Sequence, residues 1–195
     1  IHEIEHVLHF ERGILYTIRE LTTNPGQNIR KYLSENRSRL VKPIIFIIIT
    51  SLIYTILCFV FHIEDGYVKY QEAKGETPSA VGNIVKWVQE HYGYANIMMG
   101  IFIALWLKLF FRKSNYNFFE ILIMLCFVMG MGMLIFSIFV IIQGIIHFNM
   151  MAIASFIGIA YFVWAIGQFY DKKKLASYIK GLFAYILGMI TFWIF

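Results

Sequence analysis

Five stretches of this 195-residue chain are apolar over the length that a helix needs to cross a membrane. A helix rises about 1.5 Å per residue, so ~20 apolar residues span the ~30 Å of hydrocarbon in a bilayer. Only 15% of the residues are charged and 59% are apolar, which leaves too little polar surface for a water-soluble domain. The sequence therefore predicts an all-α integral membrane protein with five transmembrane helices. The expected spans are residues 43–63, 94–111, 117–142, 150–170 and 178–195, with an outer loop at 64–93.

The basic residues outside these spans are distributed asymmetrically. Fourteen of the 17 Lys and Arg residues precede the first span or accompany the turns after the second and fourth spans. Only Lys69, Lys74 and Lys86 fall on the other side. The positive-inside rule then predicts a cytoplasmic N-terminus and an outside C-terminus. The net charge of +5 follows from this bias toward anionic lipid, so it does not indicate nucleic-acid binding.

Residues 1–42 form an N-terminal segment ahead of the transmembrane domain at 43–195. A first helix is expected to run to about Leu21, because the turn-rich sequence TTNPG follows it. Asn24 is placed to cap a second helix that has Pro25 at its first position.

The second helix and the residues after it are basic. We expect Ile29, Tyr32 and Leu33 to enter the inner leaflet while the basic side chains contact anionic phospholipid headgroups or a protein partner. The alternative is a charged helix that is simply solvated. The basic candidates are Arg30, Lys31, Arg37, Arg39 and Lys42.

The first nine residues contain a candidate metal site. His2, Glu3 and His6 have the H-E-x-x-H spacing with which zinc peptidases hold the metal and a general base on one helix. His9 adds a third imidazole, and all three histidines share one helical face. A catalytic zinc also needs a further protein ligand, an open position and a cleft that excludes water, which the sequence does not supply clearly. We therefore expect no enzyme, while non-catalytic zinc binding and a solvated polar face both remain open.

Glu120 is the one acid expected within a span, about one turn from its start. Ionisable groups in membranes are costly and are often functional. The structural interpretation is an ion pair with Lys108, Arg112 or Lys180, helped by the helix dipole. The functional interpretation is a proton or substrate path in a small transporter.

Small residues recur at a spacing that lets transmembrane helices approach closely. Ala154 and Gly158 form one such pair, and Ala184 and Gly188 form another. The methionines of the MGMGM run at 129–133 alternate in direction on a helix, so we expect packing there rather than a copper site.

Residues 13–54 carry three sequence elements in order: G-h-L-Y-T with h apolar, P-G-x-x-I-R-x-Y, and R-x-x-L-x-K-P leading into the first span. This block resembles an uncharacterised family of multi-pass membrane proteins of Bacteroidetes, some of which have an H-E-I-x-H stretch just upstream. The resemblance implies the inner membrane of a bacterium and carries no established activity. Many members have an N-terminal zinc ribbon, which is absent here, and a preceding segment is expected because the chain does not begin with methionine. The five-span shape is similar to that of Yip-type trafficking proteins in architecture alone.

The functional expectation is a non-enzymatic scaffold or accessory subunit of a larger membrane complex. Its expected partners are phospholipids and either another membrane protein or further copies of itself. A small transporter or channel that uses Glu120 is the first alternative, and a metal-dependent membrane enzyme that uses His2, Glu3 and His6 is the second.

Overall fold

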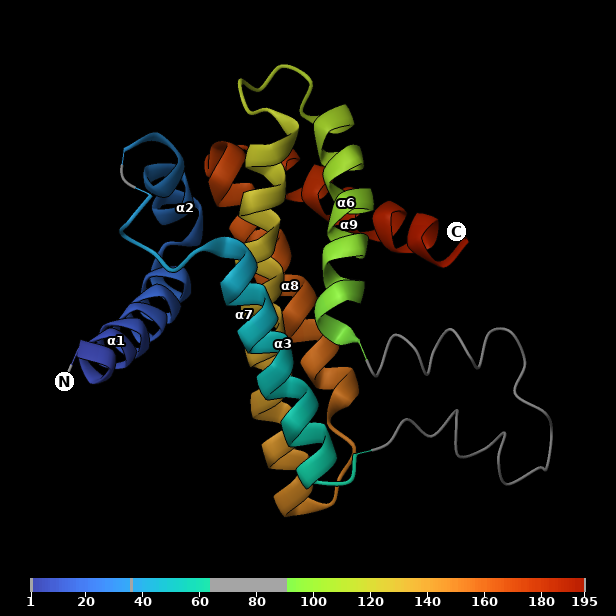
Figure 1. The fold of residues 1–195 in the computed structure, drawn as a ribbon. Coiled ribbons are helices and arrows are strands. Elements are labelled where there is room, and N and C mark those ends of the chain that lie inside the picture. Colours follow the sequence, from blue (N-terminus) through green and yellow to red (C-terminus); the bar gives the residue numbers. More distant parts are fainter. Residues whose placement is uncertain (1, 36, 64–90, 195) are drawn as a thin grey trace.

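The computed structural model describes residues 2–35, 37–63 and 91–194, with the backbone alone for residues 2–12 and 92. Within these ranges the regular structure is helical throughout, and no strand occurs there. Seven helices are described in these parts of the chain (Figure 1). They are α1 (His2–Thr23), α2 (Pro25–Ser34), α3 (Pro43–Val60), α6 (Tyr92–Phe110), α7 (Phe118–Ile146), α8 (Met151–Asp171) and α9 (Leu175–Ile194).

Five of these helices are long and apolar enough to cross a membrane, which confirms the predicted class. Three boundaries differ by three or four residues from the expected ones: α3 ends at Val60, α7 continues to Ile146, and α9 begins at Leu175. The additional turn of α7 includes Ile145 and Ile146. His147 then ends the helix in the left-handed conformation, at φ 57°, with its N–H bonded to the Gln143 carbonyl.

α7 is the central helix of the bundle. Half of its apolar stretch is buried, whereas the other four spanning helices bury between 22% and 33% of theirs. α3 runs alongside α7 in the same direction, with Phe46 next to Phe127 and Tyr54 next to Phe136. Near the far end, a Cβ at Gly144 would lie 2.6 Å from Cγ of Phe61, so only glycine allows this contact.

α9 crosses behind α6 at a steep angle in Figure 1 and packs against both α6 and α8. The close approach depends on Gly188, where a Cβ would lie 2.8 Å from the Ile103 Cα. Ala184, one turn earlier, is fully buried. Ala184 and Gly188 therefore allow the close approach of two helices that their spacing predicts. Ala154 of the first pair is also buried, and a Cβ at Gly158 would lie 3.4 Å from the Phe136 ring.

One end of the bundle gathers the basic turns 111–117 and 172–174, and we call it the basic end. The aromatic rings of Phe111 and Tyr170 stack there with centroids 3.6 Å apart, which joins the end of α6 to the end of α8. Lys180 of α9 reaches the same place and donates from Nζ to the Phe110 carbonyl at 3.1 Å. The turns after α6 and α8, which carry these basic residues, therefore lie at the same end of the bundle.

α1 and α2 form a helical hairpin against the side of the bundle (Figure 1). α2 packs on α8 and α7, and α1 extends away from the spanning helices toward the N-terminus. This corrects the expectation that Ile29 and Tyr32 enter the lipid: Ile29 is fully buried, and the Tyr32 ring lies 5.2 Å from the Phe127 ring. Leu33 is partly buried against the same core, so protein covers the apolar face of α2.

Candidate functional site

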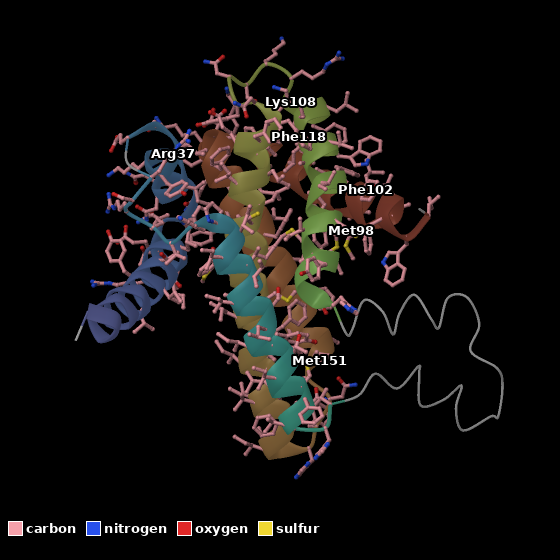
Figure 2. All side chains as sticks on the ribbon, viewed as in Figure 1. Arg37, Met98, Phe102, Lys108, Phe118 and Met151 are labelled. Atoms are coloured by element: carbon pink, nitrogen blue, oxygen red, sulfur yellow. The ribbon has the colours of Figure 1, made fainter. Side chains whose placement is uncertain are left out.

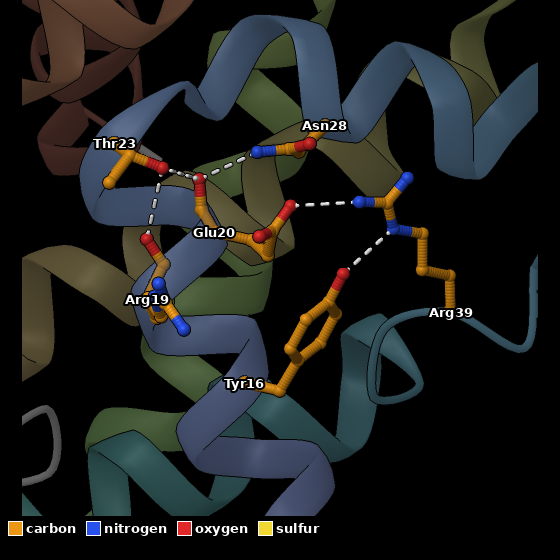
Figure 3. Close-up of polar contacts among 6 residues, drawn as sticks. All are labelled: Tyr16, Arg19, Glu20, Thr23, Asn28 and Arg39. Atoms are coloured by element: carbon orange, nitrogen blue, oxygen red, sulfur yellow. Dashed lines mark hydrogen bonds and ion pairs between the residues drawn. The ribbon is translucent and has the colours of Figure 1, made fainter.

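The hairpin is closed by a polar cluster between α1 and the segment that follows α2. Arg39 donates from Nε to the Tyr16 hydroxyl at 2.9 Å, and its Nη2 lies 3.1 Å from Glu20 Oε2 (Figure 3). Hydrogen bonding to Tyr16 raises the pKa of the Arg39 guanidinium further above its usual value. Asn28 of α2 donates from Nδ2 to the Glu20 carbonyl at 2.8 Å. An exposed ion pair is worth less than ~1 kcal/mol alone, so the closure depends on these contacts acting together.

Thr17 of α1 is fully buried and forms a second contact between α1 and the segment after α2. Its hydroxyl donates to the Gly13 carbonyl at 2.8 Å and accepts the Val41 N–H at 3.0 Å. The segment that leads into α3 is therefore held against α1 by its backbone. Sequence reasoning missed Thr17 because a helical threonine bonded to the fourth residue before it gives no distinctive pattern.

The hairpin is also fastened to the end of α8. Arg30 donates from Nη1 to the carbonyls of Gln168 and Phe169, at 3.0 and 3.1 Å. The last carbonyls of a helix have no partner within it, so the guanidinium satisfies two acceptors that α8 leaves open. At Gly26 a Cβ would lie 2.6 Å from the Gln168 Cβ, which fixes glycine at this contact.

A third contact fastens the end of α1 to the middle of α8. The Tyr161 hydroxyl donates to the Leu21 carbonyl at 3.0 Å. Together with Arg30 and Gly26, this contact makes the hairpin part of the folded bundle rather than a free surface helix.

Three of the five predicted basic residues come together, at a cleft between α1 and the start of α3. Arg37, Arg39 and Lys42 line it, and Figure 2 shows Arg37 in the segment between α2 and α3. Its volume is about 410 Å³. Arg30 is committed to α8, and Lys31 does not line the cleft. We call this feature the basic cleft; its remaining lining residues are Gly13, Ser38, Leu40, Val41 and Ile45.

Glu120 lies in the first turn of α7, where its partner is Asn117 rather than a cation. Its carboxylate accepts the Asn117 N–H at 2.8 Å, while the Asn117 side chain accepts the Glu120 N–H at 2.8 Å. This reciprocal pair is a capping box. None of the ion pairs among the described residues includes Glu120.

The two lysines predicted to accompany Glu120 also bind backbone carbonyls. Lys108 donates from Nζ to the Tyr116 carbonyl at 2.6 Å, in the turn at the top of Figure 2. Lys180 caps the end of α6 at Phe110 and lies 5.4 Å from the centre of the Phe111 ring. Each of the three residues therefore holds a helix end in place.

An aromatic cluster beside these lysines was not foreseen from the sequence. Tyr116 lies 4.4 Å from Phe169, measured between ring centroids, and it also contacts Tyr170. Burial raises the pKa of the Tyr116 hydroxyl above its ordinary value. The sequence does show many aromatic residues at the ends of these two spans. The periodicity of each helix, however, does not predict which rings of different helices contact one another.

The histidine face of the first helix lies in α1, but the side chains of His2, His6 and His9 fall outside the described ones. Among the side chains that are described, no group of three His, Cys, Asp or Glu residues could hold a metal ion. Zinc binding by these histidines stays a prediction.

A second cavity lies within the bundle, between α6, α7, α8 and α9. Its volume is about 90 Å³, and Met99, Met129 and Met133 line it together with Asn96 and aromatic residues. Met129 is almost fully buried. The methionines thus lie at an irregular part of the interior, where flexible side chains adapt to the surrounding packing.

Comparison with known proteins gives one match. Residues 11–55 match the model of a protein family described as a protein of unknown function, DUF3667. Neither the curated proteins nor the solved structures contain a match. The matched residues comprise the second half of α1, α2, the basic cleft and most of α3. This agrees with the predicted resemblance to an uncharacterised family over the same part of the chain.

Proposed function

We propose that this membrane protein is a non-enzymatic scaffold or accessory subunit, in which the α1–α2 hairpin contacts lipid headgroups and a protein partner. The observation that carries the proposal is the fastening of the hairpin to α8 through Arg30 and Tyr161. A hairpin held in this way presents a fixed surface, and a fixed surface loses less entropy when a partner binds.

The outward face of α2 supports a polar partner surface. Gln27, Lys31 and Ser34 follow one another at helical spacing, and Gln27 and Ser34 are exposed. The opposite face, with Asn28, Ile29 and Tyr32, is buried against the bundle. The polar side of α2 thus remains available for binding at the basic end.

The proposal places the basic end in the cytoplasm, as the positive-inside rule favours. It also places the protein in the inner membrane of a bacterium of the Bacteroidetes, as the resemblance of residues 13–54 implies. The match of the hairpin and α3 to one family model supports the hairpin as the functional unit.

The test is purification from native membranes in a mild detergent after chemical crosslinking. We expect a stoichiometric membrane-protein partner, or further copies of the chain, crosslinked to the polar face of α2. The double substitution Lys31→Glu with Ser34→Arg should abolish this association. The control with the same change in net charge is Arg112→Glu with Asn115→Arg in the α6–α7 turn, where both side chains are exposed, and it should leave the association intact.

Two results would overturn the proposal. One is a chain that stays monomeric and uncrosslinked at its native abundance. The other is equal loss of association in the α2 variant and in the turn variant, because that would assign the effect to general charge.

A further inference from the structure

The basic cleft has the charge for an anionic ligand. Arg37, Arg39 and Lys42 line it, and none of its lining residues among the side chains that the structure describes is acidic. Arg39 is already paired with Glu20. Neither Arg37 nor Lys42 forms an ion pair with an acid in the part of the chain that the structure describes. Two cations without an acidic partner among the described side chains therefore line one cleft.

The cleft continues onto an apolar stripe of α3. Ile45 lines the cleft and is 37% exposed, and Ile48 and Leu52 continue on the same side of the helix with 45% and 56% exposed. Residues at this spacing lie one above another on a helix. A ligand whose charged group occupies the cleft would thus have its remainder beside the apolar surface of a spanning helix.

The cleft is also held in one shape. Thr17 binds the Val41 N–H, and Arg39 binds Tyr16 and Glu20, so the 37–42 segment that forms most of the cleft is held against α1 at two points. A preorganised pocket binds a discrete ligand, whereas mobile lysines and arginines attract an anionic surface without stoichiometry.

We propose that the basic cleft binds one anionic phospholipid, with the phosphate held by Arg37 and Lys42 and an acyl chain along Ile45, Ile48 and Leu52. Arginine offers paired donors that match two phosphate oxygens, and lysine adds a point charge. The continuity of charge with apolar surface favours a lipid over a soluble phosphate. This inference rests on the lipid contact of the proposed function and is independent of any protein partner.

The experiment uses the purified full chain in detergent micelles, with bound phospholipids counted by native mass spectrometry. Phosphatidylglycerol is the anionic probe and phosphatidylcholine the neutral one, each offered over a range of concentrations. We expect one phosphatidylglycerol per chain, retained at high salt and in the presence of excess inorganic phosphate. Phosphatidylcholine should not replace it.

Three variants locate the site. Arg37→Ala with Lys42→Ala should weaken phosphatidylglycerol binding at least about tenfold, because both basic groups that hold the phosphate are removed. Arg112→Ala with Lys113→Ala removes the same charge from the α6–α7 turn and should leave binding unchanged. Gly13→Leu places bulk in the cleft without changing charge and should also abolish binding, which keeps the test decisive if the first variant folds poorly.

Equal weakening in the cleft and turn variants would overturn the proposal in favour of diffuse electrostatic attraction. Displacement of the lipid by inorganic phosphate would indicate that the cleft binds a soluble anion instead. Equal retention of phosphatidylglycerol and phosphatidylcholine would show that the cleft does not recognise the charge of the lipid. The lipid proposal is tested by counting phospholipid bound to the purified chain. The scaffold function is tested separately, by crosslinking to a partner in native membranes. Failure of this inference is therefore distinguishable from failure of the scaffold function.

Discussion

At the scale of single residues, Arg30 takes the place of a helix cap at the end of α8. Its guanidinium reaches from the hairpin to two carbonyls that α8 cannot satisfy itself. The sequence indicated a basic residue on an amphipathic helix, and every such residue is an equal candidate for contacting lipid. The distinction between Arg30 and Lys31 arises only from the orientation of α2 on the bundle.

Replacing Arg30 by alanine should destabilise the protein by about 1–3 kcal/mol, because two partly buried acceptors lose their donor. Thermal unfolding in detergent measures this effect. Lys31→Ala is the matched control one residue away and should change stability by less than ~0.5 kcal/mol. Equal effects of the two substitutions would contradict the capping role of Arg30.

His147 is held in the left-handed conformation at the end of α7, where glycine is the usual residue. Glycine adopts this conformation without the Cβ clash that other residues meet. His147→Gly should therefore raise the free energy of unfolding by about 1 kcal/mol. His147→Ala keeps the clash and should give no such gain in the same unfolding measurement.

The histidines of α1 give a prediction about the zinc content of the purified protein. If His2 and His6 bind zinc, metal analysis should find one zinc ion per chain, and His2→Ala with His6→Ala should remove it. His62→Ala with His91→Ala removes the same number of imidazoles elsewhere in the chain and should not change the zinc content. Absence of stoichiometric zinc in the unaltered chain would exclude the metal hypothesis.

At the scale of elements, the docking of α2 depends on the absence of a side chain at Gly26. The backbone of α8 at Gln168 and Phe169 occupies the space that any larger residue would need. The sequence contains this glycine in a turn-rich stretch, where it is most simply explained as a breaker. Its role in helix packing appears only when α8 is placed beside it.

Gly26→Leu should release the hairpin from the bundle and expose the segment before α3 to protease. Limited proteolysis with trypsin, which cleaves after Lys and Arg, should then cut near Arg37 and Arg39 far faster than in the unaltered chain. Gly132→Ala is the control, because a Cβ there meets nothing within 4 Å. That substitution should leave the cleavage rate unchanged, and a similar rate in both variants would argue against the docking.

The helices themselves were largely predictable, because length and hydropathy identify spans without knowledge of their neighbours. The final turn of α7 was not, since Gln143 and Gly144 are typical loop residues. In the structure Gln143 Oε1 accepts the Met150 N–H at 3.0 Å, and Gly144 accommodates Phe61. The expected immersion of α2 in lipid was wrong for a related reason. An amphipathic pattern shows that a face is covered but not what covers it.

At the scale of the whole molecule, the basic end defines a direction for the chain in the membrane. The turn 111–117 lies at that end, and residues 147–150 connect α7 to α8 at the opposite end. Asn115 and Asn149 are exposed at these two places. The positive-inside rule assigns the first to the cytoplasm.

Asn115→Cys should therefore react with a membrane-impermeant thiol reagent only from the cytoplasmic side, and Asn149→Cys only from the outside. The measurement compares intact cells with inverted membrane vesicles, in a background where Cys58 and Cys126 are replaced by serine or alanine. Labelling of Asn115→Cys in intact cells would contradict the predicted topology and indicate the opposite orientation.

The central position of α7 has a consequence for the membrane around the protein. α7 has 29 residues, about 44 Å, and its neighbours bury half of its apolar stretch. The helices that form the perimeter have 18 to 21 residues in their spanning segments, or about 27–32 Å. Four of the five spans are thus shorter than α7, and we expect these shorter spans to match the protein to thin bilayers and to make it tilt or associate with neighbours in thick ones.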